Sequence, residues 1–389
     1  MTNAIDQMMK EAIEKGVFPS ASLLVAKEGT ILHEKNYGKA RAGTCFDIAS
    51  LTKPIATATL AMEFVQEGLL KLEDTVYQWL GGARQPAHRK MTVAHLLSHT
   101  AGLTAWRPFY RELPIDQVGT PAGKQHIILS TLNELVLSEP GSQCVYSDLG
   151  YILLGEILEQ AGLANLDALF QTRIAGPLGL KDTFFVRNIG LSQGSFDPSA
   201  SSGLRMTGVS TAHGESSMPA HGELVEPQRR FAPTEDCPWR GHVLHGEVHD
   251  QNCYAMGGVA GHAGLFSTTQ DIHKFVVAFL KCYRGESNWL SQDIVKQFIE
   301  PDFHTSTLKH SYTYVLGWDT PTFGSSSAGR HFSPHSIGHL GYTGCSVWID
   351  LDKDFWIILL TNRIHPATTN EKIRAFRPRI HDLCWKEFV

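Results

Sequence analysis

The pattern of apolar and polar positions over the first 40 residues predicts a helix followed by a strand hairpin. Residues 3–16 carry apolar side chains at the spacing of an amphipathic helix. Two short apolar runs follow, 21–26 and 31–34, and they flank the glycine-containing turn sequence 27–30. We therefore expect two antiparallel strands that are joined by a tight turn.

The carboxyl-terminal region has the same elements in the reverse order. Residues 337–350 form a strand-like segment. Residues 347–350 and 355–360 predict a hairpin around the short acidic turn between them. Residues 369–388 then predict a closing helix. Strands near the two ends of the chain therefore bracket everything between them.

Helical periodicity dominates the middle of the chain, from Ser50 to about Leu180. The simplest fold is an α+β arrangement, in which both chain ends build one antiparallel sheet, terminal helices flank it, and a mostly helical lobe is inserted. We expect a sheet lobe at approximately 1–49 and 240–389 and a helical lobe at approximately 50–187. Residues 188–239 lack periodicity, which predicts an irregular lid or specificity loop. A cleft between the lobes is the expected ligand site.

Composition and charge narrow the possible partners. The 389 residues are 42% hydrophobic, so the chain can bury a large core in one catalytic unit. A net charge of −5 with no basic stripe argues against a nucleic-acid partner, and no run reaches membrane-spanning length. The start of the chain has no leader pattern, which favours a cytoplasmic location unless a leader was removed. A small-molecule substrate fits best, no cofactor is expected, and the oligomeric state stays open.

The seven cysteines are scattered and odd in number, which favours reduced thiols over a disulfide framework. Cys45 lies five residues before Ser50, but a buried core position is the expected role for such a cysteine.

The candidate nucleophile is Ser50, in the sequence Ser50-Leu51-Thr52-Lys53 at the start of an apolar helical run. Side chains three apart on a helix share a face, so the Lys53 amine is expected to reach the Ser50 hydroxyl. Unpaired backbone N–H groups and the helix dipole at a first turn also favour negative charge there.

Two other short patterns fit serine hydrolases less well. Ser306-x-x-Lys309 has the same spacing as Ser50-x-x-Lys53 but no apolar helical run behind it. The segment 190–194 spells Gly-x-Ser-x-Gly, but the Ser-, Pro- and Gly-rich residues after it cannot form the helix that a nucleophile elbow requires. We interpret both as chance matches.

Two remote segments supply partners for Ser50 that only a tertiary fold could bring close. Tyr146-Ser147-Asp148 lies between a turn and a helical run, and His339-Leu340-Gly341 lies in the strand-like segment near the carboxyl end. Ser-x-x-Lys, then Tyr-x-Asp, then His-Leu-Gly resembles the three ordered motifs of the serine β-lactamase and DD-peptidase (penicillin-binding-protein-like) superfamily. The class C and esterase-like branch is nearest, and the resemblance spans essentially residues 5–385.

The resemblance implies a serine hydrolase that forms an acyl-enzyme on an amide or ester. In this family pattern Ser50 is acylated, Tyr146 is the general base, Lys53 is its electrostatic partner, and the backbone N–H groups of Ser50 and Tyr342 form the oxyanion hole. We expect the Lys53 ammonium to lower the pKa of Tyr146, and burial to lower the pKa of Lys53.

The substrate-binding positions implied by the resemblance are Asp148, His339, Gly341 and Tyr342, and this chain departs from the family pattern at several of them. Asp148 stands where the family often has Asn, and its charge should hold Lys53 protonated. His339 stands where β-lactamases carry Lys, so a fixed cation becomes a side chain that is mostly neutral above pH ~7. Leu340 removes a threonine hydroxyl. We therefore predict poor β-lactam turnover.

Alternative functions remain open. The chain resembles a branch that includes peptidoglycan-processing and muropeptide-recycling amidases, so a cell-wall fragment is one possible substrate. A carboxylesterase and a weak class C-type β-lactamase are alternatives. A non-catalytic ligand-binding relative is a further alternative, although it would not need to keep Ser50, Lys53 and Tyr146. The His-rich region 242–262 could suggest a metal-dependent hydrolase, but its spacing matches no compact zinc motif, and histidines hydrogen-bonded along a glycine-shaped cleft loop are the preferred interpretation.

Overall fold

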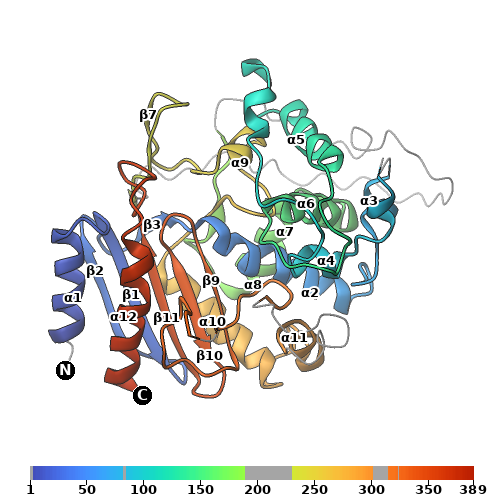
Figure 1. Cartoon of the computed structure of the whole chain (residues 1–389). Coiled ribbons are helices and arrows are strands. Elements are labelled where there is room, and N and C mark those ends of the chain that lie inside the picture. Colours follow the sequence, from blue (N-terminus) through green and yellow to red (C-terminus); the bar gives the residue numbers. More distant parts are fainter. Residues whose placement is uncertain (1–2, 82–84, 189–229, 301–313, 323) are drawn as a thin grey trace.

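One side of the protein is built on a five-stranded antiparallel sheet from both ends of the chain, and the helical region lies beside it (Figure 1). The computed structural model describes residues 3–81, 85–188, 230–300, 314–322 and 324–389. The strand order is β2-β1-β11-β10-β9. The bounds are β1 Ser20–Lys27, β2 Thr30–Gly38, β9 Ser336–Leu340, β10 Ser346–Asp350 and β11 Phe355–Thr361. Strands β1 and β11 pair directly, with Leu23 opposite Leu359, which confirms the predicted sheet and both predicted hairpins.

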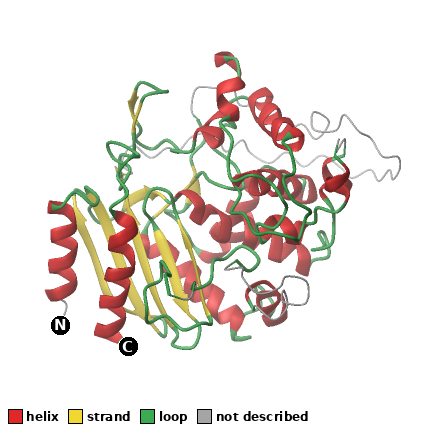
Figure 2. Cartoon of the chain, in the orientation of Figure 1, coloured by secondary structure: helices red, strands yellow, loops and turns green. Residues whose placement is uncertain are grey.

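Helices cover both faces of this sheet (Figure 2). Nearly all residues of β1 and β11 are buried, whichever face of the sheet they point to, because each face packs against its own set of apolar side chains. Leu23 and Ile357 belong to one core cluster with the terminal helices α1 (Asn3–Glu14) and α12 (Ile373–Phe388). Leu24 and Ile358 face the larger core, which includes α10 (Thr269–Tyr283). The terminal helices were expected, whereas α10 on the opposite face was not.

Two boundaries near the carboxyl end differ from the prediction. The segment 337–350 is not one strand, because it turns between β9 and β10. The backbone N–H of Gly341 donates to the carbonyl of Cys345 at 2.8 Å, and Gly344 adopts φ +101°, a value that glycine tolerates best. The closing helix begins at Ile373 rather than 369, because the side chain of Asn370 donates to the backbone carbonyls of Gly16, just after α1, and Arg363.

The middle of the chain is mostly helical, as predicted. Helix α6 (Asp148–Gly162) is buried over most of its length, since the apolar run 149–158 packs against several neighbouring helices. The other helices here are α2 Thr59–Gln66, α3 Val76–Leu80, α4 Val93–Leu97, α5 Pro121–Asn133, α7 Leu166–Phe170 and α8 Gly176–Leu178. The later helices α9 (Gln251–Ala255) and α11 (Gln292–Ile299) pack against α5 and α2, respectively. The division into lobes stays a prediction.

A second, small sheet contains β3, the strand that directly precedes Ser50 in the sequence. Its order is β4-β8-β3-β5, from strands β3 Thr44–Asp47, β4 Phe184–Phe185, β5 Arg230–Phe231 and β8 Leu265–Ser267. A separate hairpin joins β6 (Asp236–Cys237) to β7 (His242–Val243). Cys45 is fully buried in β3, which confirms its predicted core position.

Within the described ranges, no helix is both long enough and apolar enough to cross a membrane. The Gly-x-Ser-x-Gly segment 190–194, the Ser306-x-x-Lys309 match and most of the predicted lid 188–239 lie outside the described residues.

Candidate active site

Ser50 and Lys53 lie in two short helical segments that directly follow β3. Ser50 is in the 3-10 turn η1 (Ala49–Leu51), and Lys53 begins the π-helical segment η2 (Lys53–Ala58). The Lys53 side chain is fully buried, and its Nζ atom donates to Ser50 Oγ at 2.9 Å, to Asp148 Oδ1 at 2.6 Å and to the carbonyl oxygen of His262 at 3.2 Å. Three acceptors match the three protons of an ammonium group. The Lys53 amine is therefore held in place by three hydrogen bonds, one of which is to Ser50.

Two opposing effects set the charge of Lys53. Burial removes the ammonium from water and lowers the pKa of Lys53, while the negative charge of Asp148 acts in the opposite direction. Asp148 is the first residue of α6, where Ser147 caps the helix by accepting from the N–H of Gly150. Burial is the larger effect, so the pKa of Lys53 is lowered, as expected from the sequence.

Tyr146 lies two residues before α6, packed among other aromatic rings. Its ring centroid is 4.5 Å from that of His99, 5.7 Å from that of Tyr314 and 6.0 Å from that of His339. Lys53 Nζ lies 4.8 Å from the centre of the Tyr146 ring, and the Tyr146 hydroxyl hydrogen-bonds with Ser50. Ser50 is therefore in contact with both Lys53 and Tyr146.

The expectation that Lys53 lowers the pKa of Tyr146 is wrong. Burial raises the pKa of Tyr146 well above 10, and the charge of Asp148 raises it further, while the hydrogen bond with Ser50 only partly opposes them. The reason is that burial is the largest influence on Tyr146, because removing a phenolate from water costs more than the nearby groups return. Tyr146 is thus held as a neutral phenol.

The turn between β9 and β10 forms the opposite wall. Gly341 packs so closely on the residues before Ser50 that an added Cβ would lie 2.5 Å from the carbonyl oxygen of Ile48. Thr343 Oγ1 donates to the carbonyl of Asp47 at 2.7 Å, which ties this turn to β3. The Tyr342 ring is 53% exposed and stacks on His249 with centroids 5.6 Å apart. These contacts hold Tyr342 beside the Ser50 segment.

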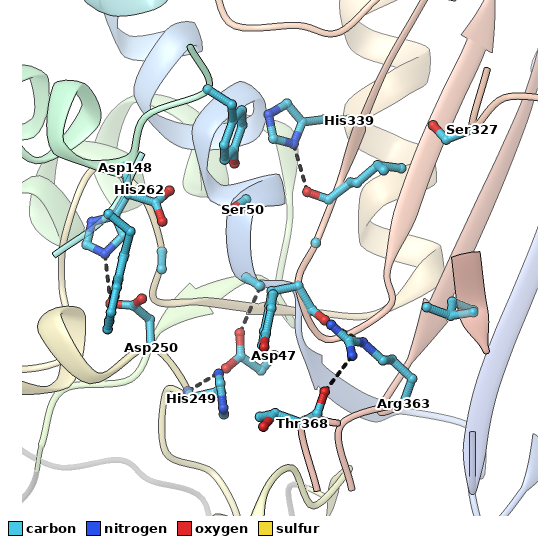
Figure 3. A pocket seen from close by; sticks show the side chains of 18 of the residues that line it. Asp47, Ser50, Asp148, His249, Asp250, His262, Ser327, His339, Arg363 and Thr368 are labelled. Atoms are coloured by element: carbon cyan, nitrogen blue, oxygen red, sulfur yellow. Dashed lines mark hydrogen bonds and ion pairs between the residues drawn. The ribbon is translucent and has the colours of Figure 1, made fainter. Parts of the chain in front are cut away.

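These residues surround one cavity of about 910 Å³. Six of the seven predicted site residues line it, namely Ser50, Tyr146, Asp148, His339, Gly341 and Tyr342, and Lys53 lies buried behind Ser50. Figure 3 shows Ser50 near the middle, His339 above it, Asp250 and His262 on one side and Arg363 on the other. The fold therefore brings together all the residues that the three sequence motifs singled out.

Three of the four histidines of the region 242–262 are hydrogen-bonded to carboxylates. His262 Nε2 lies 2.8 Å from Asp250 Oδ1, and His249 Nε2 lies 3.1 Å from Glu235 Oε2. Among the residues that the structure describes, no group of three or more His, Cys, Asp or Glu side chains could hold a metal ion. The interpretation of hydrogen-bonded histidines on a loop that lines the cleft is therefore confirmed for His249 and His262.

This loop meets α6 through two glycines. A Cβ added to Gly261 would lie 2.2 Å from the carbonyl oxygen of Tyr151, and one added to Gly155 would lie 2.9 Å from the Gly261 nitrogen. Thr57 Oγ1 donates to the Gly261 carbonyl at 2.6 Å from the other side. Because His262 follows directly, this close packing places its carbonyl oxygen on Lys53.

Comparison with known proteins identifies the family. The family model described as Beta-lactamase matches residues 5–378. The chain belongs to the beta-lactamase family. This membership makes it a serine hydrolase and confirms the resemblance of the three motifs. An Escherichia coli K12 protein named "Putative D-alanyl-D-alanine carboxypeptidase" is 30% identical, over 93% of this chain and 82% of its own length.

Solved structures of this beta-lactamase-like fold cover nearly the whole chain. The octameric penicillin-binding protein homologue from Pyrococcus abyssi has a TM-score of 0.68 at 18% identity, over 99% of this chain and 77% of that one. EstCE1, described as a hydrolase with promiscuous acyltransferase activity, has a TM-score of 0.64 at 21% identity, over 98% of this chain and 97% of that one. At these identities the likeness shows the fold.

Sequence reasoning missed two residues that position the site of this beta-lactamase-family protein. Asp47 is buried, and its carboxylate accepts from the N–H groups of Ala49 at 2.8 Å and His249 at 2.7 Å. His99 Nδ1 accepts from the N–H of Ser147 at 3.0 Å, next to Tyr146. Neither residue belongs to the three motifs that marked the candidate site in the sequence.

Proposed function

We propose that the protein hydrolyses an amide or ester through an acyl-enzyme formed on Ser50. The observation that carries this proposal is the contact of one hydroxyl with two titratable groups, Lys53 Nζ at 2.9 Å and the Tyr146 hydroxyl. A serine becomes nucleophilic when a neighbouring base accepts its proton. The backbone N–H groups of Ser50 and Tyr342 are the proposed oxyanion hole, beside the same cavity.

The directions of the two pKa shifts support a division of roles. Burial lowers the pKa of Lys53 and raises that of Tyr146, and groups whose pKa values are pushed apart suit a base and an acid, respectively. In this proposal Lys53, once deprotonated, accepts the Ser50 proton, and Tyr146 donates its proton to the leaving group. The proton on Lys53 then returns to Tyr146, which restores both groups. This assignment reverses the role that the family resemblance implied for Tyr146.

Two substrate classes fit this site. The name carried by the Escherichia coli relative favours a D-alanyl peptide, such as a peptidoglycan-derived fragment. An ester is the second candidate, because the neutral His339 replaces the cation expected for a carboxylate-bearing substrate. A cavity of about 910 Å³ can accept a small peptide or an ester.

Covalent labelling tests the nucleophile. The intact protein and its Ser50→Ala variant are treated with a fluorophosphonate and with a fluorescent penicillin, and the labelled peptide is identified by mass spectrometry. We expect fluorophosphonate on Ser50 in the wild type, weak penicillin labelling, and no label on the variant. Labelling of the variant at full strength would refute Ser50 as the nucleophile.

A further inference from the structure

The turn between β9 and β10 contains one backbone donor that has no acceptor among the described residues. The N–H of Gly341 donates to the carbonyl oxygen of Cys345 at 2.8 Å, and that of Gly344 donates to the carbonyl oxygen of Gly341 at 2.9 Å. Between them, the N–H of Tyr342 donates to no acceptor that the structure describes. Because Gly341 and Tyr342 both line the cavity, this N–H is the donor that the proposed oxyanion hole requires.

Arg363 holds two successive carbonyl groups of this turn. It lies two residues after the end of β11. Its side-chain Nε donates to the carbonyl oxygen of Tyr342 at 2.9 Å, and its own backbone N–H donates to the carbonyl oxygen of Thr343 at 2.9 Å. Both bonds end on the backbone of the turn, so they do not depend on which side chain stands at position 342. One residue therefore fixes the peptide units that follow the free N–H.

The Arg363 guanidinium is itself anchored by the loop that follows it. Its Nη1 atom donates to the carbonyl oxygens of Thr368 at 3.0 Å and Asn370 at 2.6 Å, and Figure 3 shows the first of these bonds. In return, the side chain of Asn370 donates to the carbonyl oxygen of Arg363 at 3.1 Å. Three acceptors in different directions suit the planar fork of donors that arginine has and lysine lacks. The loop therefore holds Arg363, and Arg363 holds the turn.

The backbone before Ser50 is fixed by a separate residue, Asp47. The Asp47 carboxylate accepts from the N–H of Ala49 at 2.8 Å, and Ala49 adopts φ +48°, a conformation that costs energy for a residue other than glycine. The carbonyl oxygen of Asp47 accepts from Thr343 Oγ1, which joins this segment to the turn. An oxyanion hole needs both of its donors at fixed positions. Asp47 serves the Ser50 side of the hole, and Arg363 serves the Tyr342 side.

We propose that Arg363 is a positioning residue of the acyl-transfer reaction, which fixes the backbone of Tyr342 so that its N–H donates to the oxygen of the tetrahedral intermediate. The inference rests on the proposed acyl-enzyme function of Ser50. Arg363 acts through the carbonyl group of Tyr342, since its Nε and Nη1 atoms already donate to carbonyl oxygens. A donor that is displaced stabilises the transition state less, whereas binding that does not use this donor is unchanged.

The test compares the wild type with Arg363→Met, using a substrate and an inhibitor that imitates the transition state. Ser50 Oγ adds to the boron atom of phenylboronic acid, and the tetrahedral boronate places an oxygen where the substrate oxygen becomes negative. We expect kcat/KM for p-nitrophenyl acetate to fall about tenfold or more, and phenylboronic acid to inhibit about tenfold or more weakly, because both need the same donor. Benzamide has the same phenyl group but forms no adduct, so its inhibition constant should change by less than about twofold.

Arg173→Met is the matched control. The Arg173 guanidinium also lies over an aromatic ring, 4.9 Å from the centre of Phe64, and its Nη1 atom donates to Glu67 Oε1 at 2.9 Å. Arg173 lies outside the cavity wall that the described residues form. Its replacement should lower the midpoint of thermal unfolding, as that of Arg363 should, and leave kcat/KM and inhibition by phenylboronic acid unchanged.

Arg363→Lys keeps the charge and the backbone N–H but replaces the fork of donors by one ammonium group. It should recover part of the loss, with phenylboronic acid inhibiting about threefold more weakly than in the wild type. This variant carries the test if thermal unfolding shows that Arg363→Met does not fold.

Two results would overturn the inference. One is a folded Arg363→Met, or Arg363→Lys where only that variant folds, that binds phenylboronic acid as tightly as the wild type. The other is an equal loss of affinity for benzamide and phenylboronic acid, because Arg363 would then shape the cavity as a whole. Both leave the proposed function intact as long as fluorophosphonate labels Ser50 in the wild type. Absence of that label would refute the proposed function, and the inference with it.

Discussion

The two sides of the cavity use buried polar groups in opposite ways. At Lys53 the buried charge is compensated by Asp148 at 2.6 Å, and the amine contacts three acceptors. At His339 the buried side chain is neutral, and one ring nitrogen lacks a partner among the described residues. The amine with three acceptors is fixed in one position, whereas a buried nitrogen without a partner carries a free-energy cost because it has lost its hydrogen bond to water. The two walls therefore differ in how completely their buried polar atoms are bonded.

Removing the charge of Lys53 should have the largest effect on activity. Lys53→Met should lower kcat/KM by roughly 10⁴-fold or more, as expected for a group that acts as a unit with the nucleophile. It also leaves Asp148 without its cation, which should lower the free energy of unfolding by about 3 kcal/mol.

The double variant Lys53→Met/Asp148→Asn is the matched control for this effect. It removes both charges, so denaturant unfolding should show most of the lost stability restored, while steady-state kinetics should show no recovery of activity. Activity that returns together with stability would mean that Lys53 has only a structural role.

The next effect tests whether Tyr146 acts as acid or base. Tyr146→Phe should lower turnover of an amide by roughly 10²-fold or more with folding retained, as expected for loss of an acid or base. A p-nitrophenyl ester needs little help from an acid because its leaving group departs readily, so its hydrolysis should fall much less. Equal losses for both substrates would return Tyr146 to the role of general base.

A smaller effect should appear in the pH profile of Asp148→Asn. The charge of Asp148 raises the pKa of Lys53, so its removal lowers that pKa further. The proposed base is the deprotonated amine, and the rise of kcat/KM with pH should therefore shift to lower pH in the variant. Profiles of the two proteins with one ester substrate measure this shift. A shift to higher pH would contradict the assigned base.

The smallest effect concerns the turn that holds Tyr342. Thr343→Val removes the hydrogen bond to Asp47, which should cost about 1 kcal/mol of stability and lower kcat a few-fold. Thr131→Val is the control, since its buried hydroxyl also donates to a backbone carbonyl, at 2.8 Å within α5. It should lose similar stability in thermal unfolding and keep full activity. Equal losses of activity would mean that the turn has no special role.

Ordered motifs and strand patterns predicted much of the fold and the residues of the candidate site. The sheet and the helical middle follow from local patterns, whereas the convergence of Ser50, Tyr146 and His339 was expected from the resemblance of the three ordered motifs to a known family. The direction of the pKa shift of Tyr146 could not be predicted, because it depends on how deeply the fold buries the phenol and on the nearby charge of Asp148. The partner of His339 Nδ1 likewise depends on the backbone of Leu340, which sequence alone does not position.

The glycine contact between α6 and the loop at Gly261 has a consequence for engineering this enzyme. No side chain fits at either Gly155 or Gly261, so substitutions there would push the loop away from Lys53 instead of reshaping the cavity. Mutant libraries aimed at new substrates should leave both positions fixed. Trp106 and Tyr342, which line the cavity and are 38% and 53% exposed, are the better positions to randomise.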